Sequence, residues 1–145
     1  MVIEESVFID APAETVWETF VDLACWKDWS RIIEVEEGPP RLRQGDSFRF
    51  CIRPFAFPVN MEPVLVKVEP LRLVVWEAGK FGVRAHHEFL FETEGRGVRL
   101  VSVEKFTGLK AMLLIFRISR PRLEELTRMM LAEITKAAET ASQRG

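Results

Sequence analysis

The sequence contains no tyrosine, only two cysteines and only two histidines. Cys25 and Cys51 form no CxxC pair and lack the spacing of metal ligands, so we expect no metal site and no disulfide framework, but reduced thiols in a cytoplasmic protein. The GxSxG, GxGxxG and P-loop motifs are also absent, and neither cysteine has a local base signature. The sequence therefore gives no support to a nucleophile-elbow hydrolase, a nucleotide-binding enzyme or a bound cofactor.

Long hydrophobic runs are missing as well. The longest, Ala111 to Phe116, falls far short of the roughly 20 residues that a membrane-spanning helix needs. Glu4 and Glu5 interrupt the first apolar run, so no signal peptide is expected. The net charge of −2 provides no general attraction to nucleic acid. We therefore expect a cytoplasmic protein with no integral membrane segment and no nucleic-acid partner.

The composition is that of a globular protein. The chain has 145 residues, of which 48% are hydrophobic and 29% are charged. A chain of this length buries roughly 68–70% of its unfolded surface, which is enough for a core without disulfides or metals. We find no internal repeat or linker, and we expect a single domain over residues 1–145.

A long amphipathic helix is predicted from Leu123 to Ser142. With about 100° between successive residues, its apolar side chains form one narrow stripe. The stripe consists of Leu123, Met130, Ile134, Ala137 and Ala141, with Leu126 and Ala138 at its edges. The opposite side carries Glu124, Glu125, Arg128, Lys136 and Glu139. A helix of this length with one apolar stripe needs a partner surface, and a sheet that curves around it is the expected partner.

The rest of the chain shows the two-residue period of strands. Two short helices are predicted after the first strand, starting near Pro12 and covering Leu23 to Trp29. The predicted strands are Val2 to Ile9, Ile32 to Glu37, Phe48 to Arg53, Val59 to Val68, Leu71 to Ala78, Val83 to Thr93, and Val98 to Thr107. The later connections are short, which favours antiparallel neighbours. We therefore predict an α+β fold, with a curved seven-stranded antiparallel sheet around the C-terminal helix.

Four stretches occur in a characteristic order: Ile9 to Trp17, Asp22 to Trp29, the hairpin segments His87 to Glu92 and Gly97 to Gly108, and the C-terminal helix. Together they resemble the START/Bet v1-like (SRPBCC) superfamily, whose fold is the helix grip, and within it the small bacterial proteins of the polyketide cyclase/dehydrase type. The resemblance covers essentially the whole chain. It is specific for the fold and a poor guide to function, because this fold supports binding, transfer and catalysis alike.

The resemblance implies a deep, mostly apolar cavity between the sheet and the long helix. Members of the superfamily bind sterols, lipids, polyketides or plant hormones, while others are cyclases, ubiquinone-binding proteins or regulators of the Hsp90 chaperone. They share no single catalytic motif, so none is carried over here. The expected partner is therefore a small apolar molecule such as a lipid, a quinone or a polyketide.

His87 and Glu104 are the candidate catalytic residues. Alternation places His87 on one strand face with Phe89 and Phe91, and Glu104 on one face of the next strand with Ser102. If both faces are concave, an imidazole and a carboxylate project into the cavity from adjacent strands and can pass protons near neutral pH. A structural hydrogen bond, or an anchor for a ligand carbonyl or hydroxyl, are the alternatives. Val101 and Val103 favour the opposite face.

Aromatic and flexible apolar side chains are the candidate ligand-binding residues. An apolar ligand would contact them by stacking and dispersion, while ordinary core packing is the alternative interpretation. The candidates are Trp26, Trp29, Phe48, Phe50, Trp76, Phe89, Phe91, Phe106, Met112, Phe116 and Met130.

The segment from Leu109 to Ile118 is apolar on nearly every side of a helix. It fits a buried first turn of the long helix, a mobile gate, or a contact in residues 109–122 for a homodimer or a membrane surface. Nearby arginines suit either anionic headgroups or a solvated basic face: Arg117, Arg120, Arg122 and Arg128. Three hypotheses result: a carrier of a small hydrophobic ligand, a cyclase/dehydratase-type enzyme, and a chaperone-regulator-like interaction module.

Overall fold

The computed structural model describes residues 1–53, 59–80, 82–108 and 120–144. The N-terminal elements are β1 (Val2–Ile9), α1 (Ala13–Val21), the 3₁₀ turn η1 (Leu23–Cys25), α2 (Trp26–Trp29), β2 (Ile33–Glu37), β3 (Arg49–Ile52) and β4 (Val59–Met61). The remaining elements are β5 (Val64–Glu69), β6 (Leu73–Lys80), β7 (Val83–Glu94), β8 (Gly97–Thr107) and α4 (Arg120–Arg144). The predicted α+β arrangement, with antiparallel sheets, two short helices after the first strand and a long C-terminal helix, is confirmed.

The strands form two antiparallel sheets rather than the predicted single one. The larger sheet has the order β1-β8-β7-β6-β5, and the smaller has the order β2-β3-β4. The described residues form eight strands instead of seven, because the predicted strand Val59 to Val68 divides at Glu62 and Pro63 into β4 and β5. Proline cannot donate a ladder hydrogen bond, which accounts for the break. A bridge between Ser47 and Val64 joins the two sheets at this point.

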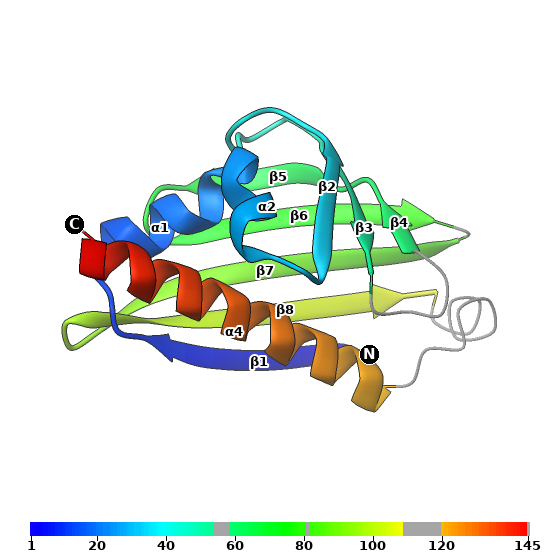
Figure 1. Cartoon of the computed structure of the whole chain (residues 1–145). Coiled ribbons are helices and arrows are strands. Elements are labelled where there is room, and N and C mark those ends of the chain that lie inside the picture. Colours follow the sequence, from blue (N-terminus) through cyan, green and yellow to red (C-terminus); the bar gives the residue numbers. More distant parts are fainter. Residues whose placement is uncertain (54–58, 81, 109–119, 145) are drawn as a thin grey trace.

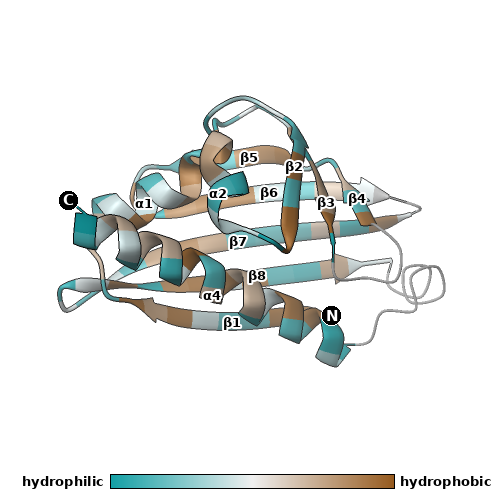
Figure 2. Ribbon diagram, viewed as in Figure 1, coloured by the Kyte–Doolittle hydropathy of each residue, from teal (hydrophilic) through white to brown (hydrophobic). Residues whose placement is uncertain are grey.

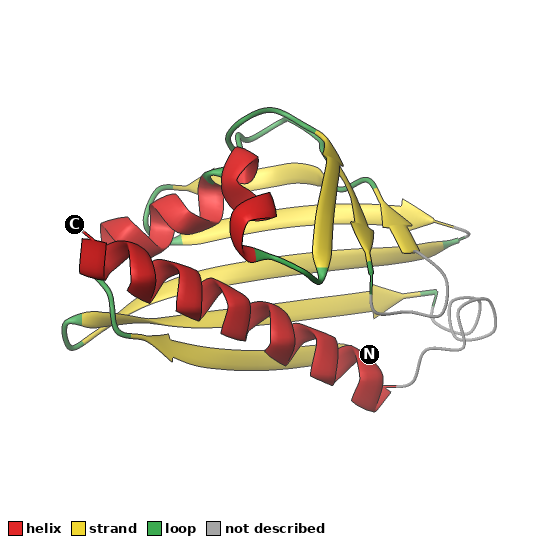
Figure 3. Ribbon diagram, in the orientation of Figure 1, coloured by secondary structure: helices red, strands yellow, loops and turns green. Residues whose placement is uncertain are grey.

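The long helix α4 lies across one face of the larger sheet, on the same side as α1 and α2 (Figure 1, Figure 3). It contacts β1 and α1. Its buried residues follow a four-residue spacing: Leu126, Thr127, Met130, Leu131, Ile134 and Ala138. The predicted stripe was therefore partly wrong, since Leu131 is buried whereas Ala141 is exposed. Because both β1 and α1 pack against this helix, its buried face is wider than the predicted stripe and is centred on different residues.

The strands of the larger sheet alternate between a buried and an exposed face. On β7 the buried residues are Val83, Ala85, His87, Phe89 and Phe91. On β8, Leu100, Ser102 and Phe106 are buried, whereas Val101 and Val103 are half-buried on the other face. Figure 2 shows hydrophobic and hydrophilic positions mixed along these strands, as expected for strands with one buried face. The even-numbered residues of β8 therefore face α4.

Aromatic side chains fill the space between the short helices and the sheet. The Phe20 ring of α1 is fully buried, with ring centroids 5.8 Å from Trp26, 4.7 Å from Phe89 and 5.4 Å from Phe91. The indole nitrogen of Trp26 donates a hydrogen bond to the Phe20 carbonyl at 2.8 Å. This end of the fold is a packed core.

Two glutamates fix α4 to segments that are distant in the sequence. The carboxylate of Glu133 accepts hydrogen bonds from the Ser30 hydroxyl at 2.8 Å and from the Arg31 amide at 2.7 Å. One turn and a half later, Glu139 accepts a hydrogen bond from the Asp10 amide at 2.9 Å. These backbone amides belong to the connections on either side of the short helices, so both contacts set the position of α4 over the sheet.

Replacing Glu133 with alanine should destabilise the fold. Glu133→Ala leaves the Arg31 amide and the Ser30 hydroxyl without their acceptor, and we expect the free energy of unfolding to fall by about 1–2 kcal/mol, because hydrogen bonds to charged groups are the stronger class and this site is partly open to water. Urea unfolding measures the change. Glu125→Ala is the matched control, since its exposed ion pair with Arg122 should contribute less than about 0.5 kcal/mol. Equal effects of the two changes would contradict this role of Glu133.

His86 lies on the outward face of the sheet, between two carboxylates. Its Nδ1 is 2.8 Å from Oε2 of Glu77 on β6, and its Nε2 is 3.0 Å from Oε1 of Glu88 on its own strand. Lys105 lies opposite it on β8. The hydrogen bond to Glu77, and then that to Glu88, raise the pKa of His86 above its ordinary value.

The stabilisation from His86 should depend on pH. A raised pKa means that the folded state holds the proton more tightly, so this stabilisation is complete below the unfolded value of about 6.5 and is lost as the pH rises through the raised value. His86→Gln should therefore lower the free energy of unfolding more at about pH 6 than at about pH 9, as measured by urea unfolding. In the background of Glu77→Gln with Glu88→Gln the difference should vanish. A loss that is the same at both pH values would show that the ion pairs do not contribute.

Candidate functional site

A cavity of about 130 Å³ lies between the two sheets and the N-terminal half of α4. The smaller sheet and the residues that flank it contribute Ile32, Ile33, Phe50, Ile52, Val59, Met61 and Pro63. The larger sheet contributes Trp76, Ala78, Ala85, His87, Glu104 and Phe106, and α4 contributes Leu123, Leu126, Thr127 and Met130. Apart from His87, Glu104 and Thr127, the described lining is aliphatic or aromatic. The cavity therefore suits an apolar guest with one polar contact.

Some of the predicted ligand-binding residues lie at this cavity and others do not. Phe50, Trp76, Phe106 and Met130 line it. The buried residues that belong instead to the packed aromatic core are Trp26, Phe48, Phe89 and Phe91. Trp29 borders a separate surface groove between α2 and α4. Met112 and Phe116, together with the rest of residues 109–119, lie outside the described residues.

His87 and Glu104 face each other across β7 and β8. The register pairs them directly, and Nδ1 of His87 is 3.4 Å from Oε2 of Glu104. The side chain of His87 is 8% exposed and that of Glu104 is 19% exposed. Both line the cavity, so the structure brings these two candidate residues together on the inward face. The partly exposed carboxylate of Glu104 and the buried imidazole of His87 thus form one polar site in an otherwise apolar lining.

Ser102 is a polar residue of this site that the sequence did not single out. Its hydroxyl oxygen lies 2.7 Å from Nε2 of His87, within hydrogen-bonding distance, and the residue is completely buried. Ser102 shares a strand face with Glu104, two residues away, so both reach the same imidazole from β8. A serine two residues before a candidate acid, on the same face, is the signal that would have found it.

The imidazole of His87 is also held between aromatic rings. It stacks on Phe89 with the ring centroids 4.0 Å apart and the planes inclined by 24°. Trp76 from β6 meets it edge-on at 5.4 Å. A ring held by two aromatic neighbours, a hydroxyl and a carboxylate has little rotational freedom, so the nitrogens keep fixed directions. The arrangement is suited to holding a proton or a ligand at a defined place.

The cysteines take no part in this site. Cys51 is buried on β3, and burial raises the pKa of its thiol. Cys25 is exposed, and its hydrogen bond with Asp22 raises the pKa of its thiol. A raised pKa leaves little reactive thiolate at neutral pH. Within the described part of the chain, no cluster of three or more potential ligands could hold a metal ion.

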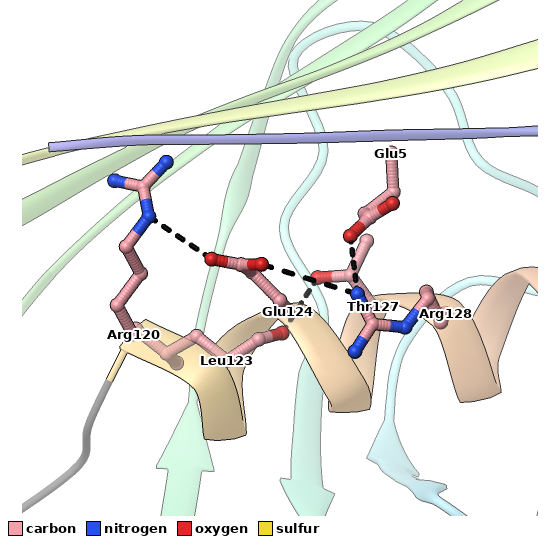
Figure 4. A network of polar contacts seen from close by, with 6 residues as sticks. All are labelled: Glu5, Arg120, Leu123, Glu124, Thr127 and Arg128. Carbon is pink, nitrogen blue, oxygen red and sulfur yellow. Dashed lines mark hydrogen bonds and ion pairs between the residues drawn. The ribbon is translucent and has the colours of Figure 1, made fainter.

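The arginines at the start of α4 are paired with acids. Arg120 contacts Glu124 at 3.0 Å, and Arg128 contacts Glu5 of β1 at 2.7 Å and Glu124 at 3.9 Å (Figure 4). Arg122 contacts Glu125 at 3.1 Å. This pairing agrees with a solvated charged face rather than with a headgroup site. Among the described helices, none has the length and apolar character needed to cross a bilayer.

Comparison with solved structures shows that this architecture recurs. A protein from Chromobacterium violaceum matches with a TM-score of 0.77 and 14% identity, over 96% of this chain and 98% of its own. A Thermus thermophilus protein matches with a TM-score of 0.75 and 19% identity, over 98% and 99%. The Zhui aromatase/cyclase from Streptomyces sp. R1128 matches with a TM-score of 0.71 and 18% identity, over 96% and 93%. At these identities the likeness shows the fold alone, which is the predicted helix grip.

Sequence comparison assigns the family. A search of curated proteins finds no match. The family model for "Polyketide cyclase / dehydrase and lipid transport" matches residues 1–140, nearly the whole chain. The cavity between sheet and helix, its apolar lining and this match lead to one conclusion: the chain belongs to the polyketide cyclase/dehydrase and lipid transport family.

Proposed function

We propose that the protein binds a small hydrophobic ligand in the cavity between the sheets and α4. The observation that carries this proposal is the cavity itself: about 130 Å³ of space on an almost entirely apolar lining, beside a core that is otherwise closely packed. Membership of a family that includes lipid transport supports it. Binding replaces empty space with dispersion contacts, which favours an apolar guest.

A second candidate function is acid–base catalysis of the cyclase or dehydratase type. The observation in its favour is the proximity of His87 Nδ1 and Glu104 Oε2, at 3.4 Å, on the wall of the same cavity. An imidazole and a carboxylate at this distance can take a proton from a bound substrate and return it elsewhere. The likeness to an aromatase/cyclase in fold is compatible with this function, and the residues that would carry it are His87 and Glu104.

Filling the cavity should abolish ligand binding. Ala85 lines the cavity and is buried, so Ala85→Phe places an aromatic ring in the space that the ligand needs. We expect native mass spectrometry to show a bound molecule on the gently purified wild type and none on this variant. Lipids, quinones and aromatic polyketides that raise the melting temperature of the wild type should leave that of Ala85→Phe unchanged.

Ala132→Phe is the matched control, because Ala132 is exposed on α4 and the same change there leaves the cavity intact. A cooperative unfolding transition for Ala85→Phe establishes that its fold is retained. If the wild type carries no molecule and no compound raises its melting temperature, or if Ala85→Phe binds as well as the wild type, the proposal is wrong.

The catalytic alternative predicts proton transfer to and from a bound ketone. We expect the wild type to accelerate exchange of the hydrogen next to the carbonyl with deuterium from solvent, as followed by NMR, and both His87→Ala and Glu104→Gln to reduce the rate by roughly 10²-fold or more, the usual scale of acid–base catalysis. His86→Ala is the control, since that neighbouring histidine points to the outer face. Exchange that survives in either cavity variant would exclude the pair as the acid and base.

A further inference from the structure

The imidazole of His87 has both nitrogens directed at protein groups. Nε2 is hydrogen-bonded to the buried Ser102 hydroxyl at 2.7 Å, and Nδ1 is 3.4 Å from Oε2 of Glu104. A carboxylate only accepts hydrogen bonds, so its contact with Nδ1 favours the form of the ring that carries a proton on Nδ1. In the neutral ring Nε2 then accepts the Ser102 hydroxyl proton, and in the charged ring it donates to that oxygen. Neither nitrogen presents a lone pair to a ligand.

Rotation of the ring cannot change this. The stacking on Phe89 and the edge contact with Trp76 keep the imidazole plane in place. A turn that freed Nε2 would also leave the buried hydroxyl of Ser102 without its partner, which is unfavourable. His87 therefore orients Glu104 rather than binding a ligand by a free nitrogen.

Glu104 is then the group that a ligand meets. Among the described residues its contact is with His87, through Oε2, and its side chain is partly exposed at the cavity. The hydroxyl of Thr127 already donates to the Leu123 carbonyl at 3.0 Å, so it too has only acceptor capacity left for a ligand. The side-chain N–H groups among the described lining residues belong to Trp76 and His87. The polar end of the cavity is thus rich in acceptors and carries a carboxylate.

The volume of the cavity also indicates the size of the guest that it shelters. Its volume is about 130 Å³, and a comparable apolar cavity of about 150 Å³ in another protein takes up benzene. A single six-membered ring with one or two small substituents is close to this size. Long acyl chains and fused multi-ring polyketides are several times larger.

We propose that the cavity selects a small neutral ligand of about one aromatic ring that carries a hydroxyl or N–H group, which donates a hydrogen bond to Glu104. This inference rests on the proposed function, that the cavity binds a hydrophobic ligand, and narrows its chemistry. A ligand carboxylate is rejected, because it would lie beside Glu104 in an apolar cavity. An apolar ring without a donor binds more weakly, because it removes water from the Glu104 oxygen that does not face His87 and gives no hydrogen bond in return.

Three probes of nearly equal shape test the chemistry: para-cresol, para-xylene and para-toluate. Isothermal titration calorimetry at about pH 7 should show para-cresol binding the wild type about tenfold more tightly than para-xylene, which corresponds to one hydrogen bond to a charged group, and should show no binding of para-toluate. Glu104→Leu removes the acceptor and should reverse the order, so that para-xylene binds more tightly than para-cresol. Glu88→Leu, on the outer face, should leave the order unchanged.

A second measurement tests whether Ser102 positions His87. If Ser102 is only structural, removing its hydroxyl should change neither the His87 ring signals nor the choice of ligand. The ring nitrogen signals of His87 in the NMR spectrum should show Nδ1 protonated in the wild type. Ser102→Ala removes the partner of Nε2, so it should shift the Nε2 signal and, by loosening the ring beside Glu104, reduce the preference for para-cresol over para-xylene. Ser102→Thr, which keeps the hydroxyl, should restore both.

The outcomes separate this inference from the proposed function. Equal binding of para-cresol and para-xylene, or tighter binding of para-toluate, overturns the selection by Glu104 while hydrophobic binding stands. Tight binding of a long-chain lipid or a fused-ring polyketide, with none of the single-ring probes bound, overturns the size limit and likewise leaves the proposed function in place. Failure of every compound to bind the wild type removes both.

Discussion

The packing of α4 against the concave face of the larger sheet is the constraint on which the rest of the structure depends. The two halves of the helix do this in different ways. Ile134 and Ala138, in the C-terminal half, are completely buried in the main core. Leu123, Leu126 and Met130, in the N-terminal half, face the cavity. The same helix therefore packs into the core at one end of the fold and forms one wall of the cavity at the other.

The carboxylates of Glu133 and Glu139 make this division stable. A helix held by apolar contacts alone could slide toward the empty space and fill it, because the hydrophobic effect has no preferred direction. Hydrogen bonds from the Arg31 and Asp10 amides fix the helix at two points along its axis. Arg128 adds an exposed contact to Glu5 on β1 (Figure 4), although an exposed pair of this kind contributes little on its own. Directional contacts outside the core thus keep the cavity open inside it.

The sequence predicted the elements better than the site, and particular residues show why. Alternation along β7 and β8 is a local property, so it placed His87 and Glu104 on one face each, and pairing of the two strands then brought them together. Pro63 lies inside the stretch from Val59 to Val68 that was predicted as one strand, and it marked the break that the prediction missed. The sequence did not show which of the inward-facing aromatic side chains line the cavity. Phe89 and Trp76 both point inward, but the Phe20 ring of α1 lies closer to Phe89, at 4.7 Å, than to Trp76, at 6.3 Å, and only Trp76 lines the cavity.

The two adjacent histidines show how much chemistry one residue of register decides. His86 lies between Glu77 and Glu88 on the outer face, where two carboxylates favour its charged form. His87 lies between Ser102 and Glu104 on the inner face, among aromatic rings. The two histidines are adjacent in the sequence, so their side chains lie on opposite faces of the strand. One forms ion pairs at the surface, and the other lines the cavity. Ser102 completes the inner site, because its hydroxyl is hydrogen-bonded to Nε2 of His87 while Nδ1 lies beside the carboxylate of Glu104.

An apolar cavity between the sheets and the helix is unfavourable for the fold by itself, because the side chains that line it have fewer packing partners than side chains in a filled core. Ala78 and Ala85 line the cavity, and larger side chains at these two positions would fill part of it. A polar pair on the wall of such a space adds a further desolvation penalty that a ligand with a donor group relieves. The small residues, the fixed helix and the His87–Glu104 pair therefore make physical sense together as parts of a site that a guest completes.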